Sequence, residues 1–133
     1  VLDYLVEESE SYDENELTSE KAKQICLEYM GESFTFLNPQ KLIEPLWKFS
    51  SSLLENKENY SQLINILMHL AGMFERALRQ DTLIAPQEEL KLTEQTERFQ
   101  QLEQALNILS GTFQIEMPQD EIYYLEQLLA YQE

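Results

Sequence analysis

The sequence of 133 residues contains one cysteine, one histidine, three glycines and four prolines. The single cysteine, Cys26, excludes an intramolecular disulfide and a cysteine-based metal site. The single histidine excludes the zinc sites that need two or three. So few turn formers in a chain with 43% hydrophobic residues favour long helices over a sandwich or barrel. No apolar run approaches the roughly 20 residues of a membrane span. These shortages predict an all-α domain with no metal, no disulfide and no membrane-spanning segment.

Basic residues are also scarce, because nine lysines and arginines stand against 25 aspartates and glutamates, and the formal net charge is −16. Nucleic-acid binding depends on Lys and Arg side chains that neutralise phosphates, so we expect no direct contact with DNA or RNA. Anionic membrane surfaces are disfavoured for the same reason. The charge favours a basic protein partner, although a charge of this size is also an ordinary means of keeping a protein in solution.

The chain divides into an acidic leader and a helical domain. Residues 1–18 are rich in acids, Ser and Asn and predict a linker from a longer parent chain, in keeping with the missing initiator Met. Residues 19–133 predict a compact antiparallel bundle of about five helices. Helices are expected over residues 19–32, 38–56 and 60–80, from Thr93 or Thr96 to Gly111, and from Pro118 onward, with a loop over residues 81–92.

Apolar residues at helical spacing identify the faces expected to form the core. The strongest pattern lies in residues 60–80, where the predicted buried stripe is Leu63, Leu67, Leu70, Phe74, Ala77 and Leu78. The helix over residues 19–32 is expected to bury Ala22, Ile25, Cys26 and Tyr29. The thiol of Cys26 is therefore predicted to be structural and unreactive.

The opposite face of the 60–80 helix carries a polar stripe in steps of three or four: Gln62, Asn65, His69, Gly72, Arg76 and Arg79. A glycine inside a helix costs about 1 kcal/mol relative to alanine, so Gly72 indicates either access to the imidazole or close helix packing. Guanidinium groups bind phosphate bidentately, so the stripe fits a phosphorylated His69 held by Arg76 or Arg79. The simpler alternative is a solvated or hydrogen-bonded histidine beside arginines that complement the helix C-terminus.

The sequence shows no pattern of an enzyme. It has no Gly-rich phosphate loop, no HExxH and no GxSxG motif. Adjacent acids at Glu88–Glu89 and Asp120–Glu121 are explained by solvation in a loop and by the positive end of a helix. We therefore expect no catalytic residue and no cofactor.

Two motifs resemble the regulation domain, or PRD, that the phosphoenolpyruvate:sugar phosphotransferase system (PTS) controls in bacterial transcriptional regulators. Residues 67–76, LMHLAGMFER, are similar to the acceptor helix of the family, in which a His precedes Leu, small and apolar residues and Glu-Arg. Residues 113–124, FQIEMPQDEIYY, are similar to its aromatic-x-Ile-x-Ile/Val-Pro-x-Asp-Glu-Ile-x-Tyr motif and keep Asp120, Glu121 and Tyr124. The lead-in SFTFLNPQKLIEPL resembles PRDs of LevR-type activators, which work with the sigma-54 RNA polymerase.

The resemblance implies a helical, often dimeric domain beside the effector domains of a cytoplasmic transcriptional regulator. It implies no enzymatic activity and no direct contact with nucleic acid. HPr or a sugar-specific IIB protein phosphorylates a His in such domains, so they report sugar availability. By position, His69 is the implied acceptor and Arg76 a nearby charge partner. Many PRDs carry a second His about where Leu128 stands. This sequence has no histidine there, so His69 is the only candidate acceptor.

The alternative from another class is a helical dimerisation or protein-interaction module without phosphate chemistry. Its natural contact surface would be the cluster of large side chains near the C-terminus: Tyr123, Tyr124, Leu128, Leu129 and Tyr131. A buried and satisfied His69 would favour this alternative.

Overall fold

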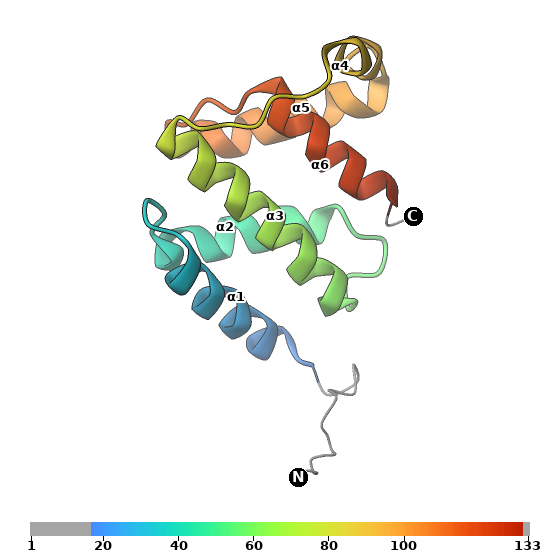
Figure 1. Cartoon of the computed structure of the whole chain (residues 1–133). Helices are drawn as coiled ribbons and strands as arrows, with labels where there is room; N and C mark the ends of the chain where they lie inside the picture. The colour runs from blue at the N-terminus through green and yellow to red at the C-terminus, as the bar shows by residue number, and fades with distance from the viewer. Residues whose placement is uncertain (1–16, 132–133) are drawn as a thin grey trace.

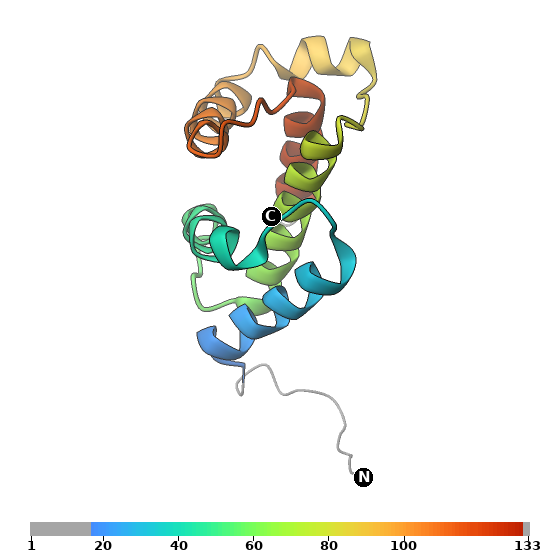
Figure 2. The same ribbon diagram turned by 90° about the vertical axis from the view of Figure 1, so that its left-hand side faces the viewer.

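The structure is a computed structural model that describes residues 17–131. This part of the chain contains no strand and six helices: α1 (Ser19–Ser33), α2 (Pro39–Ser52), α3 (Tyr60–Arg79), α4 (Gln87–Thr93), α5 (Glu97–Gly111) and α6 (Gln119–Tyr131). The predicted all-α fold is confirmed. The longest helix, α3, lies between two groups of helices (Figures 1 and 2). It packs against α1 and α2 on one side and against α6 on the other, and α6 in turn contacts α4 and α5.

Local sequence sets most helix boundaries. Four helices begin after a residue whose side-chain oxygen accepts a hydrogen bond from a backbone N–H of the first turn: Thr18, Asn38, Asn59 and Thr96. Helix α3 ends at Arg79, and the C-cap residue Gln80 adopts a left-handed conformation with φ 59°. The Asp81 N–H then donates to the Arg76 carbonyl at 2.9 Å, which closes the helix and turns the chain toward α4.

Two predicted boundaries differ from the structure. Residues 87–93, expected within a loop, form the two-turn helix α4, whose only buried side chain is Leu90. One buried residue in seven is too weak a periodicity to be recognised in the sequence. Helix α2 ends at Ser52 and not near Asn56. The predicted linker over residues 1–18 lies outside the described residues except for its last two positions.

The core is centred on the apolar face of α3, where seven apolar side chains are at most 1% exposed: Leu63, Ile66, Leu67, Leu70, Ala71, Met73 and Phe74. The predicted core face of α1 was half wrong. Ala22 and Cys26 are fully buried together with Met30, whereas Ile25 and Tyr29 are 43% and 48% exposed. The prediction of a buried, structural cysteine is confirmed for Cys26, and burial raises the pKa of its thiol to about 12.

Candidate functional site

His69 lies in the middle of α3 and is half-buried. Its Nε2 atom is buried and has no hydrogen-bond partner among the described residues. Burial lowers the pKa of the imidazole below its ordinary value of 6.5, the positive charge of Arg76 lowers it further, and Glu121 opposes both. The ring is therefore neutral at pH 7 and retains a lone pair on one nitrogen. It is neither fully open to solvent nor satisfied by hydrogen bonds.

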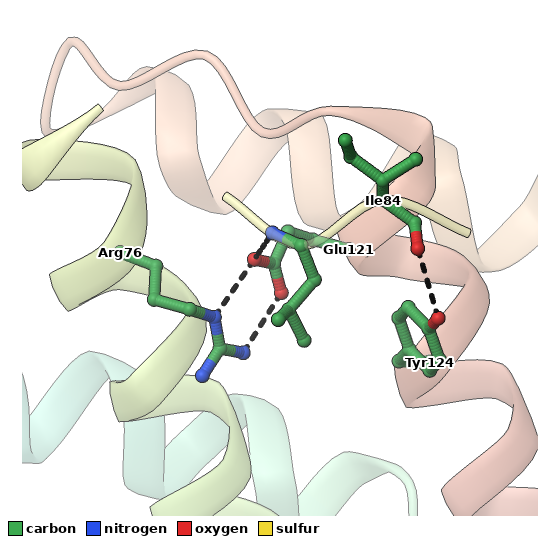
Figure 3. Close-up of polar contacts among 5 residues, drawn as sticks. Arg76, Ile84, Glu121 and Tyr124 are labelled. Atoms are coloured by element: carbon green, nitrogen blue, oxygen red, sulfur yellow. Dashed lines mark hydrogen bonds and ion pairs between the residues drawn. The ribbon is translucent and has the colours of Figure 1, made fainter. Parts of the chain in front are cut away.

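Arg76 forms a bidentate ion pair with Glu121 of α6 (Figure 3). Its Nε donates to Glu121 Oε2 and its Nη2 to Oε1, both at 2.8 Å. The Glu121 side chain is 0% exposed and that of Arg76 is 24% exposed. The hydrogen bond from Arg76 to Glu121 raises the pKa of the guanidinium above its ordinary value. The expectation that solvation and a helix terminus explain Glu121 is therefore wrong, because Glu121 is buried and paired with Arg76 of α3.

Gly72 lies between His69 and Arg76 on the same stripe of α3. The Arg76 side chain passes over it, since a Cβ added at position 72 would lie 3.3 Å from Arg76 Nη1. The sequence pattern left two explanations for this glycine, access to the imidazole or close helix packing. The structure shows that the room is taken by the guanidinium group.

Asp120 and Glu121 of α6 bind the segment between α3 and α4, residues 81–86. Leu83 N–H donates to Glu121 Oε2 and Ala85 N–H to Asp120 Oδ2, both at 2.8 Å. Between them, the Ile84 carbonyl accepts a hydrogen bond from the Tyr124 hydroxyl at 3.0 Å (Figure 3). Three consecutive residues of an extended segment thus present N–H, C=O and N–H groups to α6. The residues kept from the PRD motif hold this segment in place.

Arg79 is not brought to His69. It is exposed in the last turn of α3, ten positions further along, which is about 15 Å at the helical rise. The structure therefore places Arg76, and not Arg79, near His69.

Glu75, a residue of the motif over residues 67–76, has a structural role that the sequence did not predict. Its side chain is almost fully buried at 2% exposure. Its two carboxylate oxygens accept hydrogen bonds of 3.0 to 3.2 Å from three successive backbone N–H groups between α1 and α2, those of Thr35, Phe36 and Leu37. The available signal was an acid directly after Phe74 on the most apolar helix of the chain.

The C-terminal cluster offers less contact surface than the interaction hypothesis expected. Tyr123 is buried, and its hydroxyl donates to Glu89 at 2.7 Å, which raises the pKa of Tyr123 to about 12. Leu128 and Leu129 pack against the core, and Tyr124 is bonded to the 81–86 segment. Tyr131 is strongly exposed, at 86%.

Across residues 17–131, no cluster of three His, Cys, Asp or Glu side chains is arranged to hold a metal ion. The same part of the chain has no helix with the length and apolar character that a bilayer crossing requires.

The chain matches the PRD domain family over residues 44–132. The matched region includes all of α3 to α6, and therefore His69, Gly72, Arg76 and the motif of α6. The chain belongs to the PRD family. No curated protein and no solved structure matches it. The matched region does not include α1 and the first residues of α2. PRDs are regulatory domains that components of the phosphotransferase system phosphorylate.

Proposed function

We propose that this domain controls a sugar-responsive bacterial transcriptional regulator and that phosphorylation of His69 by the phosphotransferase system switches it. The observation that carries the proposal is a half-buried imidazole on the acceptor helix with the Arg76 guanidinium on the same stripe, across Gly72. The expected donor is HPr or a sugar-specific IIB protein.

The environment of His69 suits it to act as a nucleophile. A lowered pKa keeps the ring neutral, so one nitrogen offers its lone pair at pH 7. That nitrogen forms a bond to the phosphorus of the donor's phosphorylated side chain. The bond from phosphorus to the donor breaks with its electron pair, and the donor side chain takes up a proton. His69 then carries a phosphoryl group of about two negative charges.

The new charge forms in an acidic domain, and this supplies the switch. Residues 21–133 carry 17 acids and nine bases. A phosphoryl group in such a field either gains charge-assisted hydrogen bonds from Arg76 or repels acids of a neighbouring domain or a second copy. Both effects change how the domain associates with the other domains of its regulator. Phosphorylation thereby shifts the equilibrium between two conformational states of the regulator.

The test is phosphate incorporation from phosphoenolpyruvate. The chain is incubated with enzyme I, HPr and candidate IIB proteins, with His69→Ala as the matched variant. We expect one acid-labile phosphate in the unaltered chain and none in the variant, because His69 is the only histidine. Label that persists in His69→Ala, or no label from any donor, would contradict the assignment.

The nature of the parent protein is a further part of the proposal. The lead-in over residues 33–46 supports a LevR-type activator that works with sigma-54, and a cytoplasmic location follows from the proposed donors. In that setting the domain would make no direct contact with DNA. Arg79, at the exposed end of α3, remains a candidate for contact with a donor or a neighbouring domain.

The alternative function is a dimerisation or protein-interaction module without phosphate chemistry. It is favoured by a hollow of about 880 Å³ between α2 and α5, which includes Pro45, Phe49, Ile108 and Leu109. Ile108 is 70% exposed there. Sedimentation of the unphosphorylated chain and of Ile108→Glu tests this function. A dimer that the substitution abolishes, in a chain that no donor labels, would favour the alternative.

A further inference from the structure

Arg76 uses only part of its guanidinium group to bind Glu121. Nε and Nη2 donate to the two carboxylate oxygens, whereas Nη1 has no hydrogen-bond partner within residues 17–131. In Figure 3, no dashed line reaches this third nitrogen, which faces away from Glu121. The Arg76 side chain is 24% exposed and Nη1 is not one of the buried unpartnered atoms, so a ligand can reach it from outside.

Two residues determine where Nη1 lies. Glu121 binds the opposite edge of the planar guanidinium group. Gly72 has no side chain, and this leaves room for the guanidinium group, because a Cβ added at position 72 would lie 3.3 Å from Nη1. Long side chains in a helix lean toward its N-terminus, so Arg76 leans toward the turn that carries His69. Positions three and four apart on a helix are neighbours, and position 72 therefore lies between the imidazole and the guanidinium.

The geometry points to Gly72 and Glu121 as positioning residues that hold Nη1 of Arg76 for an oxygen of a phosphoryl group on His69. This inference rests on the proposed phosphorylation of His69. Because Nε and Nη2 stay with Glu121, the guanidinium binds the phosphoryl oxygen without leaving a buried carboxylate unpaired. The ion pair is thus a component of the acceptor site, and phosphorylation does not have to break it.

The contact can be measured without a protein donor. Potassium phosphoramidate phosphorylates imidazole directly: a ring nitrogen bonds to phosphorus, the bond from phosphorus to the amide nitrogen breaks, and ammonia leaves. The pKa of the phosphoryl group on His69 is then followed by its phosphorus NMR signal. A cation close to the phosphoryl oxygens stabilises the dianion and lowers that pKa.

The informative variant is Gly72→Leu in the 133-residue chain. Leucine is a good helix former, and its side chain leans into the space between His69 and Arg76. We expect the phosphoryl pKa to rise by about one unit, a tenfold lower proton dissociation constant. Gly72→Ala should change it less, because the end of a flexible side chain has to move by only a few tenths of an ångström. Gly31→Leu is the matched control, since nothing lies within 4 Å of a Cβ at Gly31.

A second variant covers the case in which Gly72→Leu does not fold. Arg76→Gln with Glu121→Gln removes the ion pair without burying an unpaired charge, and should raise the phosphoryl pKa as Gly72→Leu does. A phosphoryl pKa equal to that of the unaltered chain in the folded variants would overturn the inference. The proposed function fails separately: if phosphoramidate labels His69 and the pKa shifts as expected, but no protein donor labels it, the positioning of Arg76 stands and the donor assignment falls.

Discussion

Glu75 and Arg76 are consecutive residues of α3 whose side chains bind two different parts of the molecule. Arg76 pairs with Glu121 at the start of α6. Glu75 accepts hydrogen bonds from the connection between α1 and α2, at Thr35, Phe36 and Leu37. Consecutive residues on a helix point about 100° apart, so neighbouring positions can serve opposite sides. Through this pair α3 is linked by charged side chains to both halves of the domain.

Replacing Glu75 by Ala should destabilise the domain by about 3 kcal/mol, because three backbone N–H groups lose a charged acceptor and that of Leu37 is buried. Urea unfolding followed by circular dichroism measures the change. Glu44→Ala is the control, since Glu44 is 65% exposed in a surface ion pair with Lys23 and should cost less than about 1 kcal/mol. Equal losses for the two variants would show that the buried carboxylate contributes no more than a surface one.

The Arg76–Glu121 pair should show strong coupling in a double-mutant cycle. Arg76→Gln alone leaves a buried carboxylate without its cation, and we expect a loss of about 3 kcal/mol. Glu121→Gln alone removes an acceptor of Arg76 and of Leu83, at a similar cost. The double variant should be clearly more stable than the sum of the two losses predicts. Additive losses in urea unfolding would mean that the two side chains are not energetically linked.

The helices were largely predictable from the sequence because their signals are local. Asn38–Pro39 and Thr96 are start signals contained in two or three residues, and both operate in the structure. The core face of α1 was harder, because Ala22 and Cys26 belong both to a face with Ile25 and Tyr29 and to a face with Met30. The choice between these faces depends on where α2 and α3 lie, which the spacing within α1 does not contain.

The candidate site was predictable only as a set of residues on one helix. The stripe of His69, Gly72 and Arg76 follows from periodicity. The partner of Arg76 does not, because Glu121 lies 45 positions away. An acid in the first turn of a helix is well explained by the helix dipole, so nothing local marked Glu121 as buried. Only the packing of α6 on α3 removes Glu121 from solvent.

Asp120 should control the opening of the segment over residues 81–86. Asp120→Ala removes the acceptor of the Ala85 N–H, so hydrogen exchange at this amide should become faster while exchange in the middle of α3 stays slow. Unchanged exchange at Ala85 in Asp120→Ala would show that other contacts hold the segment.

Tyr124→Phe should lower the free energy of unfolding by about 1 kcal/mol, because the hydrogen bond to the Ile84 carbonyl is lost. Tyr131→Phe is the control, because Tyr131 is 86% exposed.

The environment of His69 predicts how stability depends on pH. Burial, and then the charge of Arg76 on the same helix, lower the pKa of His69 in the folded domain, and Glu121 from α6 only partly opposes this. The unfolded chain, with the ordinary value near 6.5, therefore binds a proton more readily than the folded one. The contribution of neutral His69 is fully present above pH 6.5 and is lost as the pH falls through the folded-state pKa.

His69→Gln isolates this effect, because the carboxylates are common to both proteins and cancel in the difference. The free energy of unfolding of the unaltered chain should fall relative to that of His69→Gln between pH 7 and pH 5. The Hε1 signal in proton NMR needs no assignment, since His69 is the only histidine, and its midpoint should lie below 6.5. A midpoint above 6.5 would mean that the imidazole is stabilised as a cation. The same conclusion would follow if the unaltered chain gained stability relative to His69→Gln on acidification. A cationic ring has no lone pair with which to accept a phosphoryl group, so that result would also count against His69 as the acceptor.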